Sequence, residues 1–219
     1  MRDQAGRDVS VDKLWRPTML ANAARDPYWV ATVRSEVTQT PKLSAEIQKK
    51  CATCHTPMAE VTLAAAKQPI PLLDQGLLNA QNPLHPLAVD GVSCTLCHQI
   101  EPDNLGQPAS FSGGYLIDTQ KPQGQRVSYG PFQSGQNLVD LMQVSSGFIP
   151  VQSLHLQKSG TCGTCHNLYT PFVDGSGAVA GEFAEQLTYA EWENSAFNGK
   201  QSCQACHMPQ GQGGVQLSI

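Results

Sequence analysis

Residues 51–55 read Cys51-Ala52-Thr53-Cys54-His55, and the same Cys-x-x-Cys-His pattern occurs three more times in the chain. The four copies use all eight cysteines: Cys51, Cys54, Cys94, Cys97, Cys162, Cys165, Cys203 and Cys206. A histidine follows each second cysteine, and these are His55, His98, His166 and His207. Because the copies exhaust the cysteines, this motif decides how the rest of the sequence is interpreted.

The spacing within the motif has a chemical reason. Two thiols three residues apart can form thioethers with the two vinyl groups of one porphyrin, and the next imidazole then ligates the iron. Zinc sites and thioredoxin-like dithiols also use Cys-x-x-Cys, but neither requires a histidine after every second cysteine, and a disulfide scaffold gives no reason for the histidines either. The sequence therefore predicts four covalently attached heme c groups, with the eight cysteines as attachment sites and the four histidines as proximal ligands.

Ligands for the far side of each iron are scarce. The chain has six histidines, so only His85 and His155 remain after the proximal four. They lie nine and seven residues before the first cysteine of a motif, and we predict both as distal ligands without assigning either to a particular heme. Two irons then need another ligand, for which Met19 and Met58 are the candidates, although methionine more often fills a core.

The composition is unusual for a chain of 219 residues. Only 15% of the residues are charged, 6% are aromatic, and there are 19 glycines and 15 prolines. An average soluble domain is about one quarter charged. We therefore predict a mainly α fold with much irregular loop, wrapped around four hemes that supply apolar bulk. Helices are expected at 19–25, 27–34, 58–67 and 188–197, the last opened by a capping box at Thr188, and a small hairpin at 114–118 and 125–129.

The motifs fall into two pairs. Their first cysteines are 43 and 41 residues apart within the pairs, and 68 residues separate the two pairs. This spacing predicts one tetraheme domain over 1–219, built from diheme halves at about 1–100 and 136–219 with a linker at about 101–135. Both ends are abrupt, and we interpret the chain as a fragment of a longer precursor.

Localisation follows from the same chemistry. Heme attachment to this motif takes place outside the cytoplasmic membrane, so we predict a periplasmic or extracellular protein whose export signal lies outside this numbering. No apolar run approaches the ~20 residues of a membrane span. The net charge of −4 and the lack of a basic cluster argue against nucleic acid as a partner. We expect redox partner proteins with basic docking surfaces.

Several segments together resemble one protein family. They are WRPTMLANAARDPYW at 15–29, CATCHTPMA at 51–59, HPLAVDGVSCTLCH at 85–98, HLQKSGTCGTCHNLYTP at 155–171, and the EW and CQACHMP elements within 185–209. The chain resembles multiheme cytochromes c related to the tetraheme electron carrier of ammonia oxidisers, and more distantly the hydroxylamine oxidoreductase and pentaheme nitrite reductase group. That group often carries Trp-x-x-Ser-x-His with a ligating histidine, where this chain has Leu20 and Phe197.

The resemblance implies electron transfer, in which closely packed hemes pass single electrons along the chain to redox partners. One alternative is a heme-based oxidoreductase acting on small nitrogen compounds at a ligand-poor heme. We consider an enzyme less favoured, since all four motifs end in histidine and the lysine-substituted motif of pentaheme nitrite reductases does not occur. A further alternative is a subunit of an extracellular cytochrome filament or a larger multiheme assembly.

Overall fold

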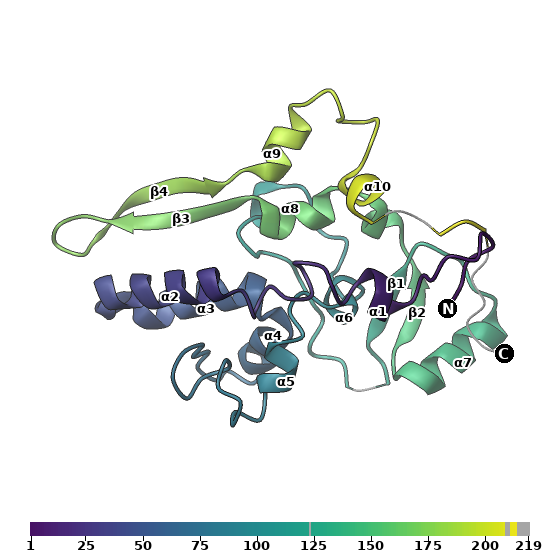
Figure 1. Cartoon of the computed structure of the whole chain (residues 1–219), viewed down its shortest axis with the longest axis horizontal. Coiled ribbons are helices and arrows are strands. Elements are labelled where there is room, and N and C mark those ends of the chain that lie inside the picture. The colour runs from purple at the N-terminus through teal and green to yellow at the C-terminus, as the bar shows by residue number, and fades with distance from the viewer. Residues whose placement is uncertain (123, 209–210, 214–219) are drawn as a thin grey trace. The chain divides into compact units, whose positions relative to one another are not determined.

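A computed structural model describes residues 1–122, 124–208 and 211–213 (Figure 1). The chain divides into two compact units. The first holds residues 1–96 and the described part of 210–219, and the second holds the described part of 97–209. Each unit is described by itself below.

The first unit is helical. Its elements are α1 (Val11–Leu14), α2 (Pro27–Gln39), η1 (Pro41–Leu43), α3 (Ser44–His55), α4 (Pro57–Ala65) and α5 (His85–Ala88). Helix α2 begins at a proline, and the Asp26 carboxylate accepts the Tyr28 N–H at 2.9 Å, which satisfies a donor of the first turn. The predicted helices at 27–34 and 58–67 are confirmed as α2 and α4.

The predicted helix at 19–25 is wrong, because turns occupy this segment. The side-chain amide of Asn22 donates to the backbone carbonyls of Arg16 and Thr18, each at 2.9 Å. A short polar side chain that bonds locally to the backbone offers the chain an alternative to a helix. Here the two hydrogen bonds of the Asn22 side chain stabilise the turns of this segment.

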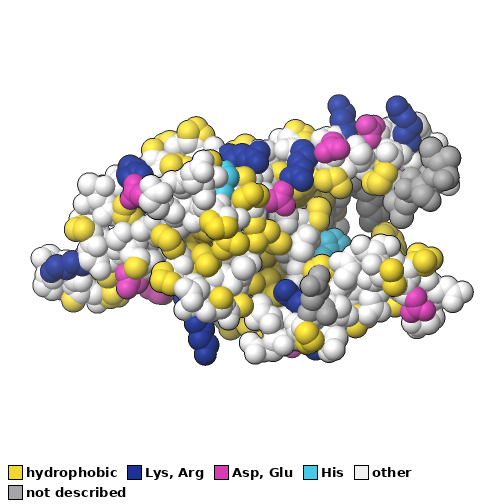
Figure 2. Space-filling view, turned by 90° about the horizontal axis from the view of Figure 1, so that it is seen from below, with side chains coloured by type: hydrophobic (Ala, Val, Ile, Leu, Met, Phe, Trp, Pro, Cys, Tyr) yellow, Lys and Arg dark blue, Asp and Glu magenta, His cyan; other side chains and the backbone are white. Residues whose placement is uncertain are grey.

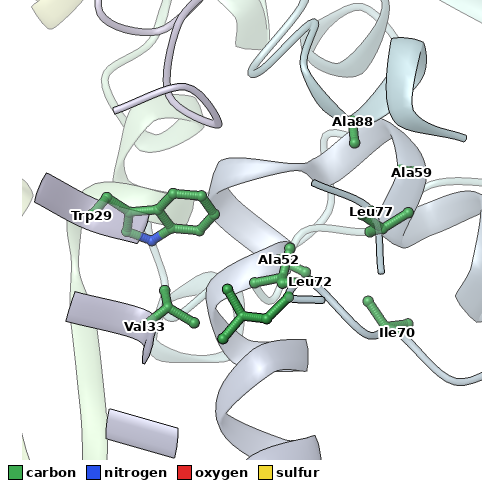
Figure 3. Close-up of a cluster of buried hydrophobic side chains, with 9 residues drawn as sticks. Trp29, Val33, Ala52, Ala59, Ile70, Leu72, Leu77 and Ala88 are labelled. Carbon is green, nitrogen blue, oxygen red and sulfur yellow. The ribbon is translucent and has the colours of Figure 1, made fainter. Parts of the chain in front are cut away.

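One apolar cluster forms the core of the first unit (Figure 3). Its members are Trp29, Val33, Ala52, Ala59, Ile70, Leu72, Leu73, Leu77 and Ala88. Trp29 and Val33 are four residues apart on α2, so they lie on one face of the helix. The Gln48 side-chain oxygen accepts the N–H groups of Leu72 at 2.9 Å and Leu73 at 3.1 Å. These two hydrogen bonds hold the irregular segment that contains Leu72 and Leu73 against α3.

The second unit contains two small sheets. Its elements are η2 (Pro108–Ser110), β1 (Val127–Gly130), α7 (Gln136–Ser146), β2 (Ile149–Gln152), η3 (Leu154–Gln157), α8 (Gly160–His166), β3 (Leu168–Val173), β4 (Val179–Gln186), α9 (Thr188–Glu193) and α10 (Cys203–His207). Strands β1 and β2 are parallel, as the helical crossover α7 between them requires, whereas β3 and β4 form an antiparallel hairpin. Helix α6 (Cys94–Cys97) lies where the two units divide.

Two predictions for the second unit are wrong. The small hairpin lies at β3 and β4, not at 114–118 and 125–129, because Val127 pairs with Ile149 in a parallel register. Ile117 instead forms an isolated bridge with Ile100. Helix α9 ends at Glu193 rather than 197, and Thr188 is its first residue, so the capping box does not form.

At the level of fold class, the described part of the chain consists of helices with much irregular loop, as predicted, and it also holds two small sheets where one hairpin was expected. No helix in the described part of the chain is both long enough and apolar enough to cross a bilayer. On the face that Figure 2 presents, Lys and Arg side chains are scattered, and hydrophobic side chains gather between them.

We expect Leu72→Ala to destabilise the first unit by about 2–5 kcal/mol, since Leu72 is fully buried in its core. Urea unfolding followed by circular dichroism measures the change. The matched control is Leu14→Ala, at a leucine that is 52% exposed, which should change the free energy of unfolding by no more than about 0.5 kcal/mol. Equal losses in both variants would contradict the assigned core.

Asp3 provides a pH-dependent contact. Its carboxylate accepts the Gln212 N–H at 3.0 Å and bonds to Arg7, and these contacts lower the pKa of Asp3 to about 2. A lowered folded-state pKa stabilises the protein above the unfolded pKa of about 3.9, and the gain disappears as the pH falls through about 2. Asp3→Asn should therefore lower the thermal midpoint at pH 7, and the difference from wild type should vanish near pH 2. A difference that persists there would rule out this linkage.

Candidate functional site

Every Cys-x-x-Cys-His motif lies on a helical turn. The first ends α3, the second starts with α6, the third ends α8, and the fourth makes up α10. On a helix, residues three and four apart lie on the same side, so the two thiols and the imidazole of a motif project from one face. Both cysteines of every motif therefore lie on a helical turn, and the histidine does so in three motifs, whereas His98 follows the end of α6.

Three of the six histidine side chains share one hydrogen-bond pattern. Nδ1 of His55 contacts the Ala23 carbonyl at 2.9 Å, Nδ1 of His85 contacts the Leu77 carbonyl at 3.0 Å, and Nδ1 of His98 contacts the Tyr129 carbonyl at 2.5 Å. A carbonyl only accepts, so each Nδ1 carries a proton, and in the neutral form of such a ring the lone pair lies on Nε2. Ligating histidines in metalloproteins are oriented in this way.

His155 is buried, and its Nδ1 partner is a hydroxyl, which can donate or accept, rather than a carbonyl. Its ring is 7% exposed, its Nδ1 lies 2.7 Å from the Ser153 hydroxyl, and its Nε2 is buried without a hydrogen-bond partner in the described structure. Burial lowers the pKa of His155, so the neutral ring is favoured. A buried, unpartnered nitrogen is costly unless something bonds to it, which makes this Nε2 a candidate ligand atom.

Tyr129 on β1 contacts two of the predicted ligands. Its backbone N–H donates to the His98 carbonyl at 2.6 Å, and its own backbone carbonyl accepts from Nδ1 of the His98 ring. Its aromatic ring meets the His155 ring edge-on, with centroids 5.1 Å apart. The Tyr129 hydroxyl donates to Glu101, and burial together with that carboxylate raises the pKa of Tyr129. One residue thus positions a predicted proximal ligand and a predicted distal ligand.

A cavity of about 650 Å³ lies beside His155 in the second unit. Tyr189 and Trp192 contribute aromatic surface to its wall, and Lys158 and Lys200 contribute positive charge. Rings of that kind suit a flat apolar group, and the lysines suit carboxylates on it. Ser202, immediately before the fourth motif, also lines the cavity, so a group attached at Cys203 would start at its edge.

The cysteines are thiols rather than disulfides. Burial raises the pKa of the Cys162 thiol to about 12, and the Cys203 and Cys97 thiols nearby add to the effect. Burial likewise raises the pKa of the Cys94 thiol. The Cys162 and Cys94 thiols therefore stay protonated at neutral pH. Cys162, Cys203 and Cys97, which belong to three different motifs, lie near one another in the second unit.

Gly163 explains how the third motif is packed. A Cβ at this position would lie 2.7 Å from Cγ of Tyr189, so only glycine lets the tyrosine ring lie on the backbone of α8. Asn167, which is 1% exposed, strengthens the contact by accepting the Ala190 N–H at 3.3 Å. The ring that lines the cavity is held by the motif itself.

Other predicted site residues lie apart from these groupings. Met19 is 71% exposed in the turns before α2, and Met58 lies half-buried on α4. His207 and Cys206 are exposed on α10. Ligation by Met19 and Met58 stays a prediction.

Sequence reasoning missed Tyr129 and Ser153, because a backbone carbonyl carries no side-chain signature and serines are common in loops.

The prediction of four covalently attached hemes needs a correction. Within residues 1–122, 124–208 and 211–213, no group of three or more His, Cys, Asp or Glu side chains could hold a metal ion. Side chains that hold a metal must converge on one point about 2 Å from each donor atom, and the residues of the motifs do not. Four metal centres are thus not supported by the structure.

The chain matches no protein-family model, no curated protein and no solved structure.

We expect Gly163→Ala to push the Tyr189 ring away from α8 and to destabilise the second unit by about 1–3 kcal/mol. Near-ultraviolet circular dichroism reports the displaced ring, and urea unfolding reports the loss. Gly175→Ala is the matched control, since nothing lies within 4 Å of its Cβ position. An unchanged aromatic signal in Gly163→Ala would refute the packing described here.

Proposed function

We propose that the chain is an electron-transfer protein of the multiheme cytochrome c kind, with the Cys-x-x-Cys-His turns as attachment points for its redox groups. The observation that carries the proposal is the shared orientation of the imidazoles. At His55, His85 and His98 a backbone carbonyl accepts a hydrogen bond from Nδ1, so that in the neutral ring the lone pair lies on Nε2. Such bonds set the direction and basicity of a ligating imidazole.

Two further features support the same conclusion. His85 and His155 belong to no motif, yet their Nδ1 atoms are held by hydrogen bonds as firmly as those of His55 and His98. An ordinary surface histidine needs no such support. His155, whose Nε2 is buried, also lines a cavity of a size that suits a flat group.

The second unit also has little apolar core of its own. Among its described residues, the buried hydrophobic side chains are Ile100 and Tyr189, whereas the first unit contains an extended cluster. A unit of about 110 residues normally buries most of its apolar surface. An apolar prosthetic group in contact with these loops would supply the burial that the side chains do not.

The proposed electron-transfer function does not depend on how many redox groups the chain carries. The chain contributes thiols, oriented imidazoles and an apolar surround. Export to the periplasm or the cell exterior and redox protein partners are part of the proposal.

To test it, the chain would be exported in a host that attaches heme to secreted proteins, purified, and titrated with dithionite. We expect reversible one-electron spectral changes, and pyridine hemochrome and intact-mass measurements give the number of attached groups. The Cys51→Ser/Cys54→Ser variant should lose one group, whereas the control Thr53→Ser should lose none. A purified chain without attached porphyrin, or one that no donor reduces, would refute the proposal.

A further inference from the structure

We infer that the β3–β4 hairpin is a docking surface for a partner protein with an apolar centre and a basic rim. The inference uses only the shape, exposure and charge of the hairpin. It rests on the proposed function for one point alone, namely that the partner is a redox protein. In Figure 1 the hairpin extends from α8 and α9 as an arm of two strands.

The arm is built to keep its shape. At its tip, one carboxylate oxygen of Asp174 accepts the N–H of Ser176 at 2.8 Å, the hydroxyl of Ser176 at 2.6 Å and the N–H of Ala178 at 3.1 Å. At its base, the buried Asn167 is fixed through its carbonyl, which accepts the Ser112 N–H at 2.8 Å. Both ends of the hairpin are therefore anchored.

Apolar side chains on the arm are exposed on both faces. The register places Phe172 opposite Gly181 and Thr170 opposite Phe183, so the two phenylalanines lie on one face, and Tyr169 lies on the other. The exposed fractions are 46% for Phe172, 49% for Phe183 and 37% for Tyr169. An uncovered two-stranded hairpin is marginally stable in water, and exposed aromatic patches are typical of protein interfaces.

The negative charge of the hairpin and of α9 indicates which class of partner can bind there. Residues 168–193 contain five carboxylates and no Lys, Arg or His, and these carboxylates are Asp174, Glu182, Glu185, Glu191 and Glu193. The Thr170 hydroxyl donates to Glu185 at 2.5 Å and orients that carboxylate, and neither Glu182 nor Glu185 takes part in a salt bridge with any described residue. Anionic membranes, nucleic acids and the same arm of a second copy would all be repelled. A basic protein surface would be attracted.

The experiment measures binding of a purified, small, basic c-type cytochrome to the full chain at low and high salt. Glu182→Lys/Glu185→Lys should weaken binding at low salt by about tenfold or more. Glu36→Lys/Glu46→Lys, exposed on α2 and α3 of the first unit, makes the same change in net charge and should weaken it less than about twofold. Phe172→Ser/Phe183→Ser should weaken binding at both salt concentrations.

Hydrogen exchange with and without the probe locates the interface, and protection is expected at 168–186. Far-ultraviolet circular dichroism checks that the variants remain folded. The inference is overturned if the probe does not bind, if both charge reversals weaken binding equally, or if protection lies elsewhere. Loss of self-association in the hairpin variants, by sedimentation, would show a second copy as the occupant and also overturn it. Binding without attached porphyrin would keep the docking surface and refute the proposed function alone.

Discussion

The donation of an imidazole Nδ1 proton to a backbone carbonyl explains much of the irregularity in this chain. The accepting carbonyls of Ala23 and Leu77 lie in turns, and that of Tyr129 lies on a four-residue strand. A carbonyl inside a long helix is already bonded within the helix and is poorly placed to accept a ring nitrogen. Loops are therefore the elements that orient these histidines, and short helices carry the motifs.

The local sequence predicted the features that local chemistry determines. Pro27 indicated the start of α2, and the Ala-rich segment 58–67 indicated α4. The pairing of Val127 with Ile149 could not be read in this way, because the parallel partner lies beyond α7. The hairpin at β3–β4 was missed because Pro171 and several glycines obscure its alternation.

The candidate site shows the same division. The cysteines and histidines carry a sequence signature, so they could be predicted as site residues. Tyr129 contacts His98 through its backbone carbonyl, which has no such signature. Gly163 matters because it has no Cβ, which leaves room for the Tyr189 ring. The number of metal centres was overestimated relative to what the described residues support, since motif counting says nothing about convergence in space. Apolar burial also differs between the two units in a way that composition, averaged over the chain, conceals.

The carbonyl partners of His55, His85 and His98 also determine when each imidazole can be oriented as the chain is synthesised from its N-terminus. His55 and His85 bond to carbonyls that precede them, so both can be set as soon as they appear. His98 depends on Tyr129, 31 residues later, and β1 in turn pairs with β2, which ends at Gln152. Closing that longer loop delays His98 until about 50 further residues have followed it. Assembly would thus run from the first unit to the second, in the order of emergence.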